Sequence, residues 1–135
     1  MERFHKLLSS ICARPAMYVG RCSFVDAANY LAGYCHALDD NAVSPKPLDG
    51  LIRWTEMRFE IRSSAWHWTR ILLHTYGDDA SCFEAFPALY DEFLADRERL
   101  GVSGIESEAT RRITARYGED WGYPESTQTT PVSER

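Results

Sequence analysis

The sequence predicts an all-α protein, a single compact bundle of about six helices with a disordered C-terminal tail. Apolar residues recur along most of the chain at the three- and four-residue spacing that marks one face of a helix. Capping-box patterns precede several of these stretches, and glycine or proline closes them. The length of 135 residues is typical of one domain. We therefore expect a helical domain over residues 1–123 and a flexible tail over residues 124–135, because this last segment lacks apolar anchors.

Two helices are predicted in the N-terminal third, on either side of a short connection. Residues 2–13 carry apolar side chains at the i, i+3, i+4 and i+7 positions of one face, so they predict a helix. Residues 14–20 predict an ordered, non-helical connection, because Pro15 disfavours the helical conformation of the residue before it. Ser23 begins a capping-box pattern, which predicts a second helix over residues 24–38.

A loop and two further helices are predicted in the middle of the chain. Residues 39–47 collect Asp, Asn, Ser and Pro, which is the composition of a loop. A helix is predicted over residues 48–59, although alternating apolar residues at 57–61 would also fit a short strand. The next helix is predicted over residues 65–76, with a serine at residues 63–64 as its N-cap.

Two more helices are predicted in the C-terminal half. Gly77 ends the preceding helix and begins a turn of four residues, which is short enough to make the next helix antiparallel to it. The most regular apolar stripe follows over residues 81–100, where Pro87 either kinks the helix or lies in its true first turn. Gly101 ends this element, and another capping-box pattern begins a more polar helix over residues 103–117.

The composition favours a cytoplasmic protein that binds another protein. No apolar run approaches the roughly 20 residues of a membrane span, and the N-terminus lacks a signal-peptide pattern. Fifteen basic against twenty acidic side chains give a formal charge of −5, which disfavours nucleic acid or anionic lipid as partners and favours a basic protein. Aromatic residues make up 13% of the chain, more than a small core needs, and surplus rings are typical of interfaces.

No group of residues predicts chemistry, so we expect neither catalytic residues nor a metal or cofactor. The sequence lacks a phosphate-binding glycine-rich loop and a nucleophile elbow. The four cysteines are widely separated and are expected to be free thiols. The histidines have none of the spacings that place two metal ligands beside a carboxylate; they are His5, His36, His67 and His74. A binding protein is therefore favoured over an enzyme.

Aromatic and acidic residues outside the predicted core are the candidates for partner binding. Trp66 and Trp68 lie about 200° apart on a helix, so one of them should be exposed. Asp78 and Asp79 lie in a predicted turn, where they either cap a helix or form a negative rim that attracts a basic partner. The candidate partner-binding residues are Tyr18, Trp66, Trp68, Asp78, Asp79 and Trp121.

One segment resembles a known group of proteins. Residues 14–20, Arg-Pro-Ala-Met-Tyr-Val-Gly, followed by Ser23-Phe24 and by the Tyr-Leu-Ala-Gly-Tyr run of residues 30–34, resemble small uncharacterised bacterial proteins with an R-P-x-M-Y-x-G segment. The resemblance covers roughly residues 5–100. It implies the role of an immunity protein, encoded beside a secreted polymorphic toxin, which neutralises that toxin by direct binding.

The same heptapeptide resembles the R-P-G-M-Y-I-G segment near the start of the gyrase B family of ATPases. That resemblance stops at seven residues, because the ATP-binding motifs and the glycine-rich lid of the family have no counterpart here. In this chain, Pro15 and Gly20 would fix the ends of a turn while Met17 and Tyr18 pin it to a core, and the corresponding residues of the gyrase segment would do the same. The sequence leaves open whether this segment is structural or functional.

Two alternatives stand beside toxin inhibition. Arg111, Arg112 and Arg116 share the last predicted helix, which in a helical DNA-binding regulator would be the recognition helix that enters a DNA groove. Neighbouring acidic residues and the negative net charge disfavour that role. The third interpretation is a small metal-dependent enzyme, which metal analysis of the purified protein would test.

Overall fold

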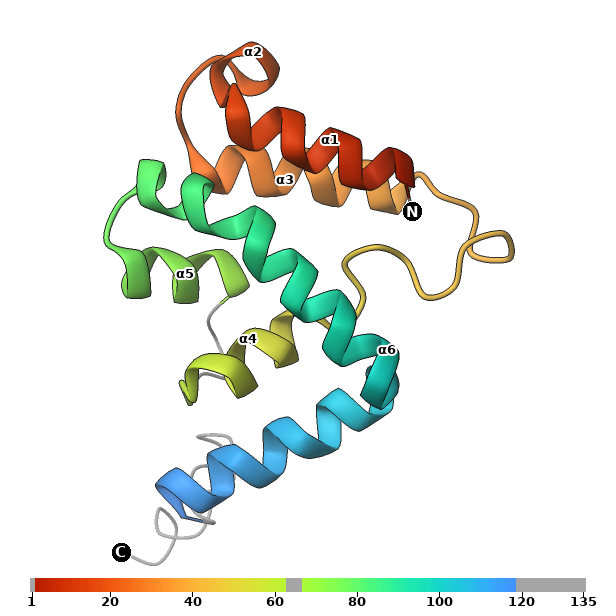
Figure 1. The fold of residues 1–135 in the computed structure, drawn as a ribbon, viewed down its shortest axis with the longest axis vertical. Helices are drawn as coiled ribbons and strands as arrows, with labels where there is room; N and C mark the ends of the chain where they lie inside the picture. Colours follow the sequence, from red (N-terminus) through yellow and green to blue (C-terminus); the bar gives the residue numbers. More distant parts are fainter. Residues whose placement is uncertain (1, 63–66, 119–135) are drawn as a thin grey trace, which may run out of the picture.

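The computed structural model describes residues 2–62 and 67–118, and the regular elements of these residues are all α-helices (Figure 1). The helices are α1 (Glu2–Ala13), α2 (Pro15–Val19), α3 (Phe24–His36), α4 (Leu51–Phe59), α5 (Trp68–Tyr76) and α6 (Asp79–Tyr117). The predicted all-α class is confirmed. Within the described ranges, no helix combines the length and the apolar content that crossing a membrane requires. The predicted tail and its boundary at residue 123 lie outside the described residues.

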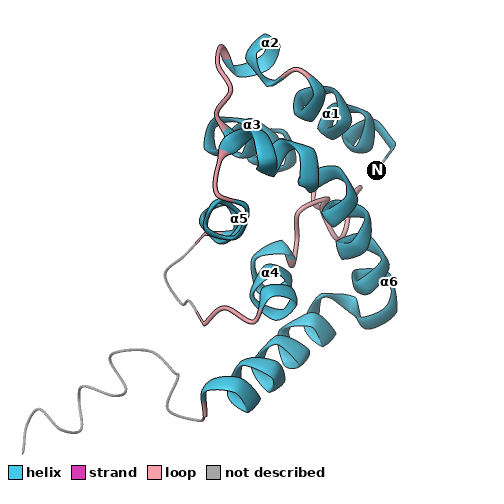
Figure 2. Ribbon diagram, turned by 60° about the vertical axis from the view of Figure 1, so that its left-hand side comes forward, coloured by secondary structure: helices cyan, strands magenta, loops and turns pink. Residues whose placement is uncertain are grey.

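Helix α6 runs through the length of the molecule and bends once, at Gly101 (Figures 1 and 2). Gly101 has φ +78° and ψ 165°, a backbone conformation that is essentially limited to glycine. The bend divides α6 into a first arm, residues 79–100, and a second arm, residues 102–117. Helix α4 lies in the angle between the two arms and packs on α6 more extensively than any other described helix does. Helices α1, α3 and α5 pack against the first arm.

The core is built from aromatic rings that α3, α5 and α6 bring together. The ring of Phe24 meets those of Trp68, Phe83 and Phe86 edge to face, at centroid separations of 5.8, 5.2 and 5.5 Å. Trp68 stacks on Phe86 with centroids 5.1 Å apart. Trp54 is also buried, so both tryptophans of the described residues lie inside. We inferred an interface from the surplus of aromatic residues, but the rings of the described residues lie largely in the core. That inference from composition is therefore wrong for these rings.

Residues 15–19 of the segment over residues 14–20 form helix α2, so the predicted non-helical connection is wrong. Pro15 lies at the first position of α2, where the missing N–H of proline costs nothing and its fixed φ suits a helix. The rule that disfavours helix before proline applies only to Arg14, which is indeed non-helical with φ −143° and ψ 66°. Gly20 ends the helix in the left-handed conformation, with φ +86°.

The other helices of the N-terminal two thirds are confirmed, some with shifted ends. Helix α1 begins and ends where predicted, and Ser23 caps α3 by accepting a hydrogen bond from the N–H of Asp26 at 3.2 Å. Within the stretch that also fitted a strand, residues 57–59 are helical and α4 ends before Glu60, which has a left-handed backbone conformation; α4 begins at Leu51 rather than at residue 48. Helix α5 begins at Trp68, and the predicted serine caps at 63–64 lie outside the described residues.

Helix α6 begins earlier than predicted and continues through Pro87. The N-cap is Asp78 and not Ser81, because the Asp78 carboxylate accepts a hydrogen bond from the Ser81 N–H at 2.7 Å. Pro87 lies inside the helix, beyond its first turn, and the non-helical backbone angles occur at Gly101 instead. The predicted break at Gly101 is therefore a bend between two helical arms.

Candidate protein-binding site

An exposed apolar cluster lies on α2 and on the neighbouring part of α3. Met17 is 72% exposed, and Tyr18 and Tyr30 are 37% and 43% exposed. The rings of Tyr18 and Tyr30 meet edge to face with their centroids 5.9 Å apart. Met17, Tyr18 and Tyr30 are called the α2 patch below. Contrary to the expectation that Met17 and Tyr18 pin this segment to the core, both side chains face solvent.

The local sequence holds the α2 patch in a fixed position. Helix α2 is five residues long and buries none of them completely, but Val19 packs against the core. Pro15 restricts the start of the helix, and the N–H of Gly20 closes it by donating to the carbonyl of Ala16 at 2.9 Å. A cluster ordered before binding loses less conformational entropy when a partner docks.

A groove with a volume of about 360 Å³ lies between α2 and the start of α6. Pro15 and Cys22 line it on the α2 side, and Ala80, Ser81 and Glu84 line it on the α6 side. The remaining lining residues are Cys12 and Phe83. The groove borders the segment that carries the α2 patch, so one partner can contact both.

Two thiols near the groove, those of Cys12 and Cys82, are poorly suited to chemistry. Burial raises the pKa of Cys12 to about 12. Burial and the nearby carboxylates Asp79 and Asp78 raise the pKa of Cys82 to about 11. Both thiols therefore stay protonated at neutral pH, and a protonated thiol is a weak nucleophile and a poor metal ligand.

The two acids of the predicted negative rim have different roles. Asp79 is half-buried and accepts a hydrogen bond from the backbone N–H of Phe24 at 2.9 Å, which joins the start of α3 to the start of α6. Asp78 is exposed, and the hydrogen bonds that it receives from Ser81 lower the pKa of its carboxyl group. Asp78 is thus an exposed charged group beside the groove, whereas the Asp79 carboxylate holds the starts of α3 and α6 together.

Of the remaining candidate residues, one lies in the core and two lie outside the described residues. Trp68 is 4% exposed and stacked on Phe86, so it is a core residue and not an exposed anchor. Trp66 and Trp121 lie outside the described residues. Tyr18 lies on α2 and Asp78 caps α6, and the groove lies between these two helices. Met17 and Tyr30 were missed, although Tyr30 could have been found because it falls off the apolar face of its helix.

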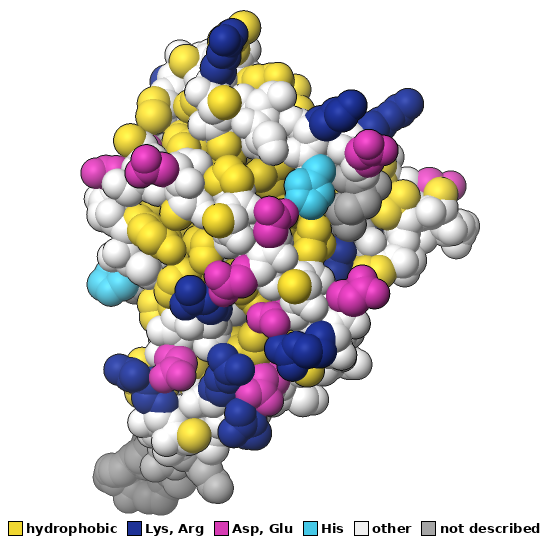
Figure 3. Space-filling model, in the orientation of Figure 1, with side chains coloured by type: hydrophobic (Ala, Val, Ile, Leu, Met, Phe, Trp, Pro, Cys, Tyr) yellow, Lys and Arg dark blue, Asp and Glu magenta, His cyan; other side chains and the backbone are white. Residues whose placement is uncertain are grey.

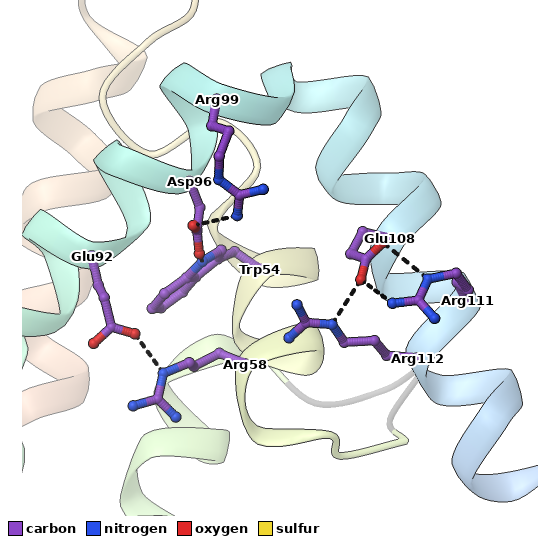
Figure 4. Close-up of polar contacts among 8 residues, drawn as sticks. All are labelled: Trp54, Arg58, Glu92, Asp96, Arg99, Glu108, Arg111 and Arg112. Carbon is purple, nitrogen blue, oxygen red and sulfur yellow. Dashed lines mark hydrogen bonds and ion pairs between the residues drawn. The ribbon is translucent and has the colours of Figure 1, made fainter.

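The opposite end of the molecule carries charges of both signs that neutralise one another. Figure 3 shows apolar side chains gathered over the upper half of one face, and basic and acidic side chains interleaved over the lower half. On the second arm of α6, Glu108 binds both Arg111 and Arg112, which lower the pKa of its carboxyl group to about 2 (Figure 4). Arg116 pairs with Glu60 at 3.3 Å. The arginines of the DNA-binding alternative are therefore already engaged by acids.

The described histidines take part in local contacts rather than in a shared cluster. His5 lies 2.8 Å from the carboxylate of Asp91, between α1 and α6. His67 caps α5 by accepting a hydrogen bond from the N–H of Thr69 at 3.3 Å, and burial lowers the pKa of its ring. Within residues 2–62 and 67–118, no three His, Cys, Asp or Glu side chains lie close enough together to hold a metal ion.

Comparisons of the chain with protein-family models, with curated proteins and with solved structures found no significant match. The resemblance therefore rests on the residues that carry it alone, which are 14–20, 23–24 and 30–34. Residues 14–20 form α2 with its flanking Arg14 and Gly20 and hold Met17 and Tyr18, and residues 30–34 hold Tyr30, so the segments that carry the resemblance also carry the exposed cluster.

Proposed function

We propose that the protein is a stoichiometric protein-binding inhibitor, and that it works as an immunity protein which neutralises a bacterial toxin by occluding it. The observation that supports binding is the α2 patch, where Met17 and two tyrosine rings are held in solvent beside a groove. Methionine and tyrosine are enriched at protein interfaces, and clustered exposed apolar groups are typical of them. The toxin as partner is taken from the resemblance of residues 14–20 and 30–34, which together hold the three residues of this patch.

The charges around the site favour a partner with basic groups next to an apolar surface. Glu84 lines the groove on the α6 side, Asp78 accepts a hydrogen bond from the lining residue Ser81, and the whole chain has a formal charge of −5. On the α2 side, Arg21 is neutralised by Asp26 at 2.7 Å, whereas Arg14 donates to the Sδ of Met17 at 3.9 Å, so we expect the basic groups of the partner beside the α6 acids rather than over α2. Exposed acids of this kind mainly raise the association rate, whereas the apolar contacts supply most of the affinity.

The interface must extend beyond the α2 patch itself. Stable complexes bury about 1,200–2,000 Å² in total, which is more than three side chains can provide. The groove beside α2 offers further surface, and its buried Phe83 gives it an apolar lining. We therefore expect the partner to cover α2 and insert a side chain or a short segment into the groove.

The test is a co-expression assay with the toxin candidate encoded beside the gene. The wild-type protein should restore growth, and a double variant with Met17→Ser and Tyr30→Ser should bind the toxin about tenfold more weakly or worse and fail to restore growth. Ile52→Ser is the matched control, because Ile52 is 44% exposed but lies on α4, in the other half of the molecule. This control should behave like the wild type.

Two results would count against the proposal, one against the α2 patch as the interface and the other against toxin inhibition itself. A double variant that melts at the wild-type temperature and binds the toxin with unchanged affinity would place the interface elsewhere on the protein. A neighbouring gene product that is harmless, or that the wild-type protein does not bind, would reject toxin inhibition itself.

A further inference from the structure

A second concave site lies at the bend of α6, remote from the α2 patch. Its volume is about 590 Å³, which is within the range of about 300–1,000 Å³ that small-molecule sites occupy. Ser44 and Pro45 line it from the connection between α3 and α4, and Leu94, Arg97 and Val102 line it from both sides of the bend. The lining is mainly apolar, with one buried basic side chain.

That basic side chain, Arg97, is only 8% exposed and is held in place by neutral groups. Its Nη1 donates hydrogen bonds to the backbone carbonyls of Lys46 at 2.7 Å and Asp49 at 3.0 Å. Its guanidinium carbon lies 5.0 Å from the centroid of the Phe93 ring. These contacts fix the orientation of the guanidinium without neutralising its charge.

The charge of Arg97 has no counter-ion among the described residues. No carboxylate oxygen of that part of the chain lies within 4.0 Å of its nitrogens, and neither Nε nor Nη2 donates a hydrogen bond there. Within the described ranges, no fully buried side-chain nitrogen lacks a hydrogen-bond partner, so these two nitrogens must reach accessible space. Arg97 lines the pocket, so we take the pocket as the accessible space that these two nitrogens reach.

From this geometry we infer that the pocket at the bend of α6 binds a small organic carboxylate, with Arg97 as the group that holds its charge. A guanidinium offers two parallel N–H donors that match the two oxygens of a carboxylate. The apolar side chains of Pro45, Leu94 and Val102 would contact the body of the ligand. A buried cation without a counter-ion is costly, and a bound carboxylate removes that cost.

Glu98 limits the negative charge that a ligand of this pocket can carry. It also lines the pocket and is exposed, so its negative charge acts on any anion that enters. The single guanidinium pairs with one carboxylate, so a second negative charge on the ligand would meet Glu98 without a cation of its own, which favours a monoanion over a dianion. The pocket therefore suits a carboxylate with one negative charge and an apolar body.

The test is an NMR titration of the full chain with 4-phenylbutyrate, and with the neutral 4-phenylbutyramide as the matched probe. The acid should produce saturable shift changes at the amides of Leu94, Gly101 and Val102 and at the Nε–H of Arg97, with a dissociation constant on the order of 1 mM. The amide should bind at least about tenfold more weakly, because it cannot neutralise the guanidinium.

Three variants test whether the acid binds in this pocket, because we expect a weaker affinity in the first, a tighter one in the second and an unchanged one in the third. Arg97→Lys should weaken binding of the acid about tenfold, because an ammonium cannot offer the paired donors. Glu98→Gln should tighten it about threefold by removing the repulsion, and it changes an exposed side chain that the fold does not need. Glu84→Gln, an exposed acid on the same helix but at the groove beside α2, should leave the affinity unchanged.

The proposal is overturned if the acid and the amide bind equally well, if the shift changes do not saturate, or if they spread over the surface. An unchanged affinity in Glu98→Gln would also overturn it, and this variant gives an answer even if Arg97→Lys does not fold. None of these results bears on the α2 patch, since the inference does not rest on the proposed inhibitor function.

Discussion

Replacing Asp79 with alanine separates a structural role of this carboxylate from a role in partner binding. Its oxygen accepts the N–H of Phe24, the first residue of α3, at 2.9 Å. The N–H groups of the first turn have no acceptor within their own helix, and Ser23 already serves that of Asp26. Asp79→Ala therefore leaves the Phe24 N–H without its partner, beside a ring that packs on Trp68.

The expected loss of stability follows from this one contact. A donor left unsatisfied in the interior costs about 1–3 kcal/mol, and the Phe24 N–H is only partly buried, so the lower part of this range, about 1–2 kcal/mol, applies. The entropy of unfolding is about 2.1 cal/mol/K per residue, so 1 kcal/mol lowers the melting temperature of a domain of this size by roughly 4 °C. We expect Asp79→Ala to melt about 4–8 °C below the wild type.

Asp79→Asn is the matched control, because asparagine keeps an oxygen acceptor and loses the charge. Thermal unfolding followed by circular dichroism should show that asparagine recovers most of the stability that alanine loses. The association rate with the partner should be nearly the same for Asp79→Asn and the wild type. Asp78→Ala, by contrast, should slow association, because Asp78 is the exposed acid of the pair.

Two outcomes would refute this assignment. If Asp79→Ala unfolds with a free energy within about 0.5 kcal/mol of the wild type, the hydrogen bond to Phe24 does not hold α3 to α6. If Asp79→Asn melts like the wild type but associates about tenfold more slowly, the charge of Asp79 belongs to the interface after all.

The core, a buried acid and the arginine surface give three further tests. Trp68→Ala should lower the free energy of unfolding by about 3–5 kcal/mol in urea denaturation, and a loss below about 1 kcal/mol would contradict its place in the core. Burial raises the pKa of Glu56 above 4.5 despite its ion pair with Arg53, so its contribution to stability is lost as the pH rises through that pKa. Glutamine stays neutral, so Glu56→Gln should melt at a higher temperature than the wild type at about pH 8 but not at about pH 4. The same difference in melting temperature at both pH values would contradict this reasoning. Replacing Arg111 and Arg112 with alanine should leave the weak affinity for duplex DNA unchanged, at a dissociation constant above about 1 μM near 150 mM salt, because both are already paired.

Features set by neighbouring residues in the chain were predictable from the sequence. The Ser23 cap, the end of α5 at Gly77 and the break at Gly101 all depend on residues within a few positions of one another. The same is true of α1, whose apolar spacing determines both the helix and its buried face. Helix α2 was missed because two local rules compete at Pro15, which both disfavours helix before it and favours helix after it.

Features set by distant residues were not predictable. Asp79 was proposed as a binding residue because its partner, Phe24, is 55 positions away and cannot be inferred from spacing. Trp68 was kept as a candidate anchor because Trp66 and Trp68 face different directions on a helix, although its spacing to Ile71 and Leu72 points it inward. Arg97 was not singled out, since its role depends on backbone carbonyls 48 and 51 positions earlier.

The two proposed sites lie in different halves of the molecule, and this separation makes each proposal testable without the other. The α2 patch lies at the end formed by α1, α2 and α3, whereas the Arg97 pocket lies at the bend between the arms of α6 (Figure 1). Mutations at Met17 leave the contacts of Arg97 with Lys46 and Asp49 intact. Changes at well-separated positions usually act additively, so Met17→Ser combined with Glu98→Gln should show both single effects at full size. A toxin affinity that changes when the carboxylate pocket is filled would instead show that the two ends of the molecule are energetically coupled.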